Sequence, residues 1–299
     1  MFYFFIVMYM NTHDETNFNM NNKPNNKSNN KPNNKPNNKP KRKSRPKTTD
    51  LATQQEDTEE RQTSAKKIET HDKSQPFSDV LLSIRKNLKT WVFFALAVWI
   101  VAQENVLRGF ITFGVMLFLV YWVHSESHSV RNFFTISHHY HHENNNWLSH
   151  GIQILMELQF GMVFPLVNEL LLNDIFDKWI IIMLYIFYTS VHNINYSILH
   201  INRTHELHHA HIFTNLGPDI CDIIFQSKDQ SNVGDDGYIE DTSHYIPNII
   251  VGTICVMILK HIYSNPIYKV VLDMLSYFVL SVITLIILCT NTYLMFNYA

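Results

Sequence analysis

Histidines dominate the chemistry that this sequence can perform. The chain has 17 histidines, and 13 of them fall between residues 124 and 211. Their spacing defines three groups: His124 and His128; His138, His141 and His142; and His205, His208 and His209. Residues three or four positions apart lie on one face of an α-helix. Each group can therefore present two or three imidazole nitrogens to a metal ion.

The number of imidazoles indicates which kind of site they form. Eight protonated imidazoles in one pocket would repel one another strongly, whereas neutral imidazoles that bind metal avoid this conflict. Imidazole is a suitable ligand for iron, zinc, copper and nickel, so the ligand type alone does not select the metal. Eight ligands exceed the needs of one ion. The sequence therefore predicts a site for two metal ions, formed by three separated stretches.

Metal-bound imidazoles need hydrogen-bond acceptors behind them, which fix the tautomer of each ring. Six polar residues near the histidines can supply them: Glu143, Asn193, Asn195, Asn215, Asp219 and Asp222. We select Asn195, Asn215 and Asp222, although ordinary loop polarity explains each residue taken alone. The other histidines of the body are expected at the surface or behind the ligands: His139, His150, His211, His244 and His261.

The elements that carry these histidines are strongly apolar. Six segments are rich in large apolar side chains: 91–102, 109–123, 151–172, 179–191, 246–259 and 270–298. The first two are shorter than the roughly 20 residues of a straight spanning helix, so we expect a tight hairpin or two tilted helices. A soluble helical domain is the alternative, but it buries only one or two such segments. We predict an all-α integral membrane bundle of about four to six spanning helices with a histidine-rich metal-binding cap.

Composition separates a polar tail from this apolar body. Residues 21–40 hold five copies of a four-residue unit that starts Asn-Asn-Lys, and 41–47 are strongly basic. With no apolar face to bury, residues 1–80 are expected to be largely disordered. The tail is either a basic tether for an anionic surface or a low-complexity expansion without a role. We assign 85–228 to the membrane domain, 229–245 to a polar loop and 246–299 to a hydrophobic hairpin.

Charge and cysteine content exclude two other classes. The formal net charge is −2, which excludes a generally basic nucleic-acid-binding protein. Three widely spaced cysteines cannot form a disulfide framework. Lys and Arg cluster at 41–47 and again at Arg85, Lys86 and Lys89, and such clusters favour the cytosolic side of a membrane. Two crossings return the chain to that side at His124 and two more at His200, so we expect cytosolic histidines.

Together these motifs resemble the membrane fatty acid hydroxylase / sterol desaturase superfamily. The resemblance covers roughly residues 121–227 and is carried by four stretches: YWVHSESH at 121–128, HHYHH at 138–142, the stretch from His192 to Tyr196, and HELHHAHIFTNLGPDICDIIFQS at 205–227. In the family, the last histidine motif is typically followed by Asn, Gly, Asp and Phe. Here Asn215, Gly217, Asp222 and Phe225 fit those places.

The resemblance implies a four-helix membrane core with a cytosolic site for two iron ions, for which zinc can substitute. It implies oxygen-dependent hydroxylation or desaturation of a lipid acyl chain or sterol in an endoplasmic-reticulum-like membrane, with dioxygen as co-substrate. A cytochrome b-type or ferredoxin-like protein would donate electrons, and no nucleic acid is expected as a partner. The eight histidines fall on the family's motifs, His192 matches a ninth ligand, and His200 is a candidate tenth. Tyr196 and Trp147 are candidates for lining the substrate path.

Two departures from the family pattern leave alternatives open. The ending that follows Phe225 reads Gln226-Ser227 instead of Gly-Thr, and an HPxE element appears as His150-Gly151-Ile152-Gln153. These changes bear on substrate identity more than on metal binding. One alternative is a membrane protein with a structural zinc site, although such a site needs only four ligands. Another is an inactive relative that serves as a membrane scaffold. The substrate, and the choice between hydroxylation and desaturation, stay open.

Overall fold

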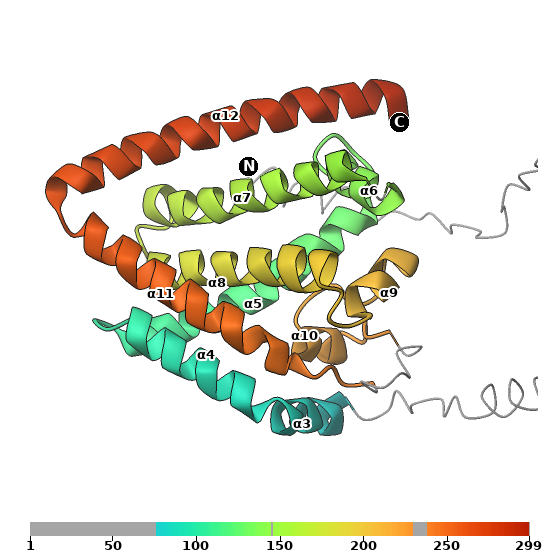
Figure 1. Cartoon of the computed structure of the whole chain (residues 1–299), viewed down its shortest axis with the longest axis horizontal. Coiled ribbons are helices and arrows are strands. Elements are labelled where there is room, and N and C mark those ends of the chain that lie inside the picture. The colour runs from blue at the N-terminus through green and yellow to red at the C-terminus, as the bar shows by residue number, and fades with distance from the viewer. Residues whose placement is uncertain (1–75, 145, 230–237, 299) are drawn as a thin grey trace, which may run out of the picture. The chain divides into compact units, whose positions relative to one another are not determined.

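The computed structural model describes residues 76–144, 146–229 and 238–298, and all secondary structure within these ranges is helical (Figure 1). This confirms the predicted all-α fold. The described residues all lie in one compact unit. The repeats and the basic run of the predicted tail lie outside the described residues. An α-helix begins at Pro76, within the last residues of the predicted tail, and proline suits the first turn of a helix.

Six helices correspond to the six predicted apolar segments, and shorter helices connect them. The long helices are α4 (Leu88–Val101), α5 (Val106–Ser129), α7 (Trp147–Leu171), α8 (Lys178–Ser190), α11 (Ile246–Tyr263) and α12 (Pro266–Tyr298). The short α-helices are α3 (Pro76–Lys86), α6 (Ile136–Glu143), α9 (Thr204–Ala210) and α10 (Asp219–Ile224). A π-helix, Val191–Ile198, continues α8, and a 3₁₀-helix, Thr242–Tyr245, leads into α11 inside the predicted polar loop.

The six long helices form three antiparallel hairpins: α4 with α5, α7 with α8, and α11 with α12 (Figure 1). Helix α8 lies at the centre and packs against α4, α5, α7 and α11. The shared core contains buried residues from four helices, among them Val98, Met116, Ile180 and Val256. Gly109 permits the close approach of α5 to α4, because a Cβ atom there would lie 2.4 Å from the Cβ of Ala102. The short helices α3, α6, α9 and α10 gather at one end of the hairpins.

Four helical segments are long and apolar enough to cross a membrane: Val106–Ser129, Trp147–Leu171, Thr242–Tyr263 and Pro266–Tyr298. Helix α4 is equally apolar but has only 14 residues. The outer faces carry many exposed apolar side chains, such as Phe278 and Phe296 on α12. A soluble protein rarely exposes apolar surface on this scale. These features fit a membrane protein, with the short helices at one end of the candidate spanning helices.

The C-terminal hairpin packs into the same bundle as the helices that carry the histidines. Helix α11 contacts α4 and α8, while α12 contacts α6 and α7. A hydrogen bond joins the hydroxyl of Ser137 on α6 to the buried Asn291 on α12. Gln159 on α7 donates to Thr284 on α12 at 3.0 Å. The last hairpin therefore supports the helix that holds His138, His141 and His142.

Candidate metal centre

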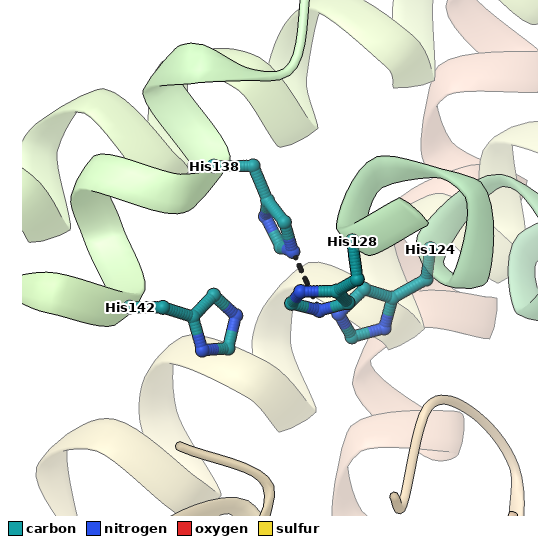
Figure 2. A group of neighbouring side chains, drawn as sticks. All are labelled: His124, His128, His138 and His142. Carbon is teal, nitrogen blue, oxygen red and sulfur yellow. Dashed lines mark hydrogen bonds between the residues drawn. The ribbon is translucent and has the colours of Figure 1, made fainter. Parts of the chain in front are cut away.

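The first histidine group lies where α5 ends and α6 begins. His124 and His128 extend from the last turns of α5, and His138 and His142 from α6, so that the four rings face one another (Figure 2). One nitrogen from each ring lies within 4.8 Å of the others. The Nε2 atoms of His128 and His138 are 3.0 Å apart. Both helices place their histidines one turn apart, as the spacing predicts.

A second group stands beside the first. It contains His141 from α6, His192 from the π-helix and His205 from α9, again with one nitrogen each within 4.8 Å. The rings of His192 and His205 meet edge to face, with centroids 4.4 Å apart. Because His141 and His142 are adjacent in α6, this helix contributes a ligand to each group.

His208 and His209 complete the two groups. The Nε2 atom of His208 is 3.1 Å from Nε2 of His124 in the first group. The Nε2 atom of His209 is 3.0 Å from Nε2 of His205 in the second. The rings of His142 and His209 stack at a centroid distance of 4.3 Å, which joins the groups. The structure thus brings together all nine histidines that the sequence singled out as principal ligands.

The tautomers of His124 and His208 follow from the atoms behind them. Nδ1 of His124 is 2.5 Å from the carbonyl oxygen of Leu216, and Nδ1 of His208 is 2.7 Å from that of Thr214. A carbonyl oxygen only accepts, so both Nδ1 atoms carry the proton and both Nε2 atoms have a free lone pair. These two lone pairs face each other at 3.1 Å with no proton between them. A cation bound by both nitrogens removes the repulsion.

Glu157 likewise fixes the proton of His192 on Nδ1. Its carboxylate accepts from Nδ1 of His192, from Asn193 at 2.6 Å and from Gln153 at 3.0 Å. Glu157 is only 4% exposed, in the middle of the apolar helix α7. The sequence analysis missed this residue. An ionisable residue inside a spanning segment is costly and commonly functional, and this signal was available in the sequence.

Asp222 supports the ligands through the backbone and not through an imidazole. Its carboxylate accepts from the backbone N–H groups of Leu216 at 2.8 Å and Gly217 at 3.3 Å, and from the hydroxyl of Ser227 at 2.7 Å. This fixes the loop whose carbonyl group accepts from His124. Gly217 is required there, since a Cβ atom would lie 3.0–3.3 Å from Tyr121. Burial raises the pKa of Asp222 to about 7, although Lys228 lowers it.

Two further predictions about acceptors need correction. Asn215 contacts no imidazole: its side chain donates to the carbonyl of Thr204 at 3.2 Å and accepts from the N–H of Asp229 at 3.1 Å. It stabilises the same loop, in which it takes a left-handed backbone with φ 51°. Asn195 donates to the carbonyl of His244 at 3.1 Å and to the side chain of Asn248 at 2.9 Å. The direct acceptors behind His124 and His208 are backbone carbonyls, which residue type cannot reveal.

The candidate tenth ligand, His200, does not join either group. It is exposed and has a left-handed backbone with φ 48° at the end of the π-helix. His211, expected outside the ligand set, pairs with Asp229 at 2.6 Å. His150 lies behind His141, with ring centroids 5.5 Å apart. We therefore count nine candidate ligands.

Burial keeps the imidazoles of the cap neutral. Burial first, and the neighbouring imidazoles second, lower the pKa of His141 to about 2 and that of His209 to about 4. The pKa values of His138, His205 and His208 are lowered for the same reasons. Both ring nitrogens of His141 are buried without a hydrogen-bond partner among the described residues. Buried polar atoms of this kind call for a ligand, and a metal ion supplies one.

A cavity of about 100 Å³ reaches the centre from the interior of the bundle. His124, His192, His205 and His208 line one part of it, and apolar residues of α4 and α8 line another, including Trp91, Phe94 and Phe187. Tyr196 also lines the cavity, and its ring stacks on His205 at 5.9 Å. Trp147, the other residue predicted on a substrate path, is 93% exposed and takes no part in the cavity.

The fold and the site define a helical protein suited to a membrane, with a histidine cluster that can hold metal. No family model, no curated protein and no solved structure matches the chain.

Proposed function

We propose that this protein uses two iron ions and dioxygen to hydroxylate or desaturate a lipid acyl chain or sterol in a membrane. The observation that carries the proposal is the convergence of nine largely buried imidazoles in two adjacent groups, in which the unprotonated nitrogens of His124 and His208 face each other. The apolar cavity that reaches the same imidazoles supports a lipid as the substrate.

The residues present fit a pair of metal ions. The first ion would be held by His124, His128, His138 and His142 together with His208, and the second by His141, His192 and His205 together with His209. Each group offers at least three neutral nitrogens. Three of the nine rings, those of His124, His192 and His208, carry their proton on the nitrogen that faces away from the centre. Imidazole-rich sites suit iron and zinc alike, so zinc is a plausible substitute in purified protein.

Bound iron would supply the activation of dioxygen and the removal of hydrogen from an unactivated C–H bond. The chain's own part is to hold the substrate and keep water out. The cavity walls of Trp91, Phe94 and Phe187 would place an apolar chain against His124 and His205. A small electron-transfer protein, cytochrome b-type or ferredoxin-like, would deliver electrons. We place the histidines on the cytosolic side of an endoplasmic-reticulum-like membrane, where such donors operate.

Two other functions compete with this proposal. A structural zinc site is closed by four ligands, and the first group alone holds that number. The second group and the cavity would then have no purpose. An inactive membrane scaffold would not need unprotonated nitrogens buried in opposing pairs. The described geometry therefore favours the oxidative function.

The test is lipid oxidation by the purified protein. Protein in detergent is loaded with ferrous iron and incubated with a lipid extract, dioxygen and a reducing system, and the lipids are analysed by mass spectrometry. We expect hydroxylated or desaturated lipid that depends on dioxygen and is absent from the His208→Ala variant. One bound zinc per chain with no lipid product after iron loading would overturn the proposal and favour the structural site.

A further inference from the structure

Helix α3 has its polar and apolar faces reversed relative to a helix on a soluble protein. Asp79 and Ser83 are buried, and the buried stripe continues with Asn87 and Thr90 at the start of α4. These four residues are spaced by three or four positions, so they form a single face. A surface helix normally buries its apolar stripe. The opposite arrangement requires a polar interior on one side and an apolar environment on the other.

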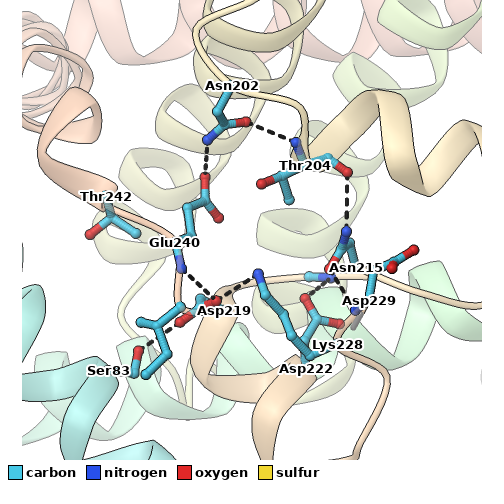
Figure 3. Close-up of polar contacts among 12 residues, drawn as sticks. Ser83, Asn202, Thr204, Asn215, Asp219, Asp222, Lys228, Asp229, Glu240 and Thr242 are labelled. Carbon is cyan, nitrogen blue, oxygen red and sulfur yellow. Dashed lines mark hydrogen bonds and ion pairs between the residues drawn. The ribbon is translucent and has the colours of Figure 1, made fainter. Parts of the chain in front are cut away.

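The polar interior is visible in the structure. Ser83 donates to Asp219 at 2.7 Å, and Asp219 also forms an ion pair with the buried Lys228 at 2.7 Å (Figure 3). The side chain of Asn87 donates to the carbonyl of Glu240 at 2.9 Å and accepts from the N–H of Thr242 at 2.9 Å. The polar face of α3 and of the residue that follows it is thus hydrogen-bonded to Asp219, Glu240 and Thr242, at the end of the bundle that holds the histidines. It cannot turn outward without breaking these bonds.

The opposite face of α3 is apolar and exposed. Phe77, Leu81 and Leu82 are 75%, 52% and 53% exposed. Beyond the basic residues at the end of α3, the exposed apolar face resumes on α4, where Leu88, Val92, Leu96 and Trp99 are 57%, 48%, 44% and 62% exposed. The outer face of α4 belongs to the bundle's apolar exterior. The chain therefore extends an apolar, outward face past the end of α4 into the cap.

Basic residues mark the junction between these helices. Arg85, Lys86 and Lys89 are exposed, and no acidic residue lies between them in the sequence. Long cationic side chains reach phosphate groups while their stems stay among apolar groups. An apolar stripe beside such residues is typical of a helix that lies in the membrane–water interface.

We propose that α3 lies in the headgroup layer of the membrane leaflet next to the histidine cap. Phe77, Leu81 and Leu82 enter the upper acyl chains, and Arg85 and Lys89 reach the lipid phosphates. The partner is the lipid leaflet, because the exposed apolar face resumes on the lipid-facing side of α4. This position in the membrane holds the polar face of α3 against the end of the bundle that contains the histidines. It does not depend on which metal the histidines bind.

The test measures depth with a spin label at Leu81→Cys, in a chain whose exposed cysteines are replaced by Cys255→Ala and Cys289→Ala. The matched control is Arg203→Cys, at the residue just before α9, whose side chain is 70% exposed. The full chain is reconstituted in phosphatidylcholine liposomes, with or without phosphatidylglycerol. Collisions with dissolved oxygen and with a water-soluble nickel chelate are compared by electron paramagnetic resonance.

We expect the label at position 81 to collide several-fold more with oxygen than with the nickel chelate, and the label at position 203 to show the reverse. Equal access of the nickel chelate at both positions would overturn the proposal. Spin–spin broadening at position 81 would also overturn it, because a second copy of the chain would then cover the stripe. Leu81→Trp, quenched by brominated lipid in the same liposomes, provides a second readout that needs no cysteine replacement.

Discussion

Opposing lone pairs are the most informative feature at the scale of single residues. The carbonyls behind His124 and His208 fix both protons on Nδ1, which leaves Nε2 of each ring to bind a cation. His192 is oriented in the same way by Glu157. Three rings from α5, the π-helix and α9 are thus prepared as neutral ligands before any metal binds.

The ligand assignment predicts the effect of single alanine substitutions. His208→Ala and His209→Ala should each lower lipid oxidation by more than about 100-fold, since a ligand contributes more than the partner behind it. Membrane insertion should be unchanged, because neither residue lies in a spanning helix. His200→Ala, at an exposed position outside both groups, is the control and should keep its activity. Activity that survives the loss of either ligand would refute the assignment.

Glu157 is expected to act through His192. Glu157→Gln keeps the shape of the side chain but removes its charge, and the loss of such a partner typically weakens metal binding by about 10- to 100-fold. Titration with a competing chelator measures this change. Glu143→Gln is the control, because Glu143 is an exposed partner of Arg131 at 2.9 Å. Equal metal affinity in both variants would show that Glu157 does not tune the site.

The sequence identified the candidate ligands but not the groups that orient them. Helical spacing places His138, His141 and His142 on one face, and this needs no knowledge of the rest of the fold. The acceptors behind His124 and His208 are carbonyls of Leu216 and Thr214, 92 and 6 residues away. Any residue type has a carbonyl, so only the folded chain shows which one is used.

At the scale of elements, the loop between α9 and α10 depends on Asp222. In Asp222→Asn, the amide nitrogen cannot accept a hydrogen bond, so one of the buried donors around it loses its partner, at a cost of about 1–3 kcal/mol. We expect a lower unfolding temperature and a lower metal affinity of the first histidine group. Glu206→Gln on the exposed face of α9 is the control. An unchanged unfolding temperature for Asp222→Asn would contradict this role for the loop.

Helix α12 is expected to stabilise α6 through Asn291. Asn291→Leu leaves the hydroxyl of buried Ser137 without its partner and should cost about 1–3 kcal/mol. Thr292→Val, one position along on the exposed face, removes a hydroxyl without affecting α6. Thermal unfolding in detergent compares the two variants. Equal stability would mean that α12 packs on α6 without supporting it.

Apolar composition predicted the six long helices, because a segment that must avoid water has few other conformations in a membrane. It did not predict α3. The first residues of α3, 76–80, fell within the predicted polar tail, and Asp79 and Ser83 are polar residues that composition does not predict to be buried. Ser83 is paired with Asp219, 136 residues away, and the neighbouring Asn87 with Glu240, 153 residues away. Hydrogen bonds between residues so far apart in the sequence cannot be predicted from the residues around α3.

At the scale of the whole molecule, the three hairpins place both chain ends of the described body and all nine ligands at one end of the bundle. We expect this end to face the cytosol. In sealed microsomes, an impermeant maleimide should label Glu206→Cys on α9 without detergent. Asn265→Cys, in the turn between α11 and α12 at the opposite end, should react only after permeabilisation. The reverse pattern would place the histidines in the lumen.

The central claim is that the nine imidazoles hold two metal ions side by side, and metal analysis of the purified full chain tests it most directly. After reconstitution with ferrous iron and removal of excess metal, we predict two irons per chain. Mössbauer spectra of the oxidised protein should show that the two ions are magnetically coupled. A single ion per chain, or two ions without coupling, would contradict a shared dinuclear centre.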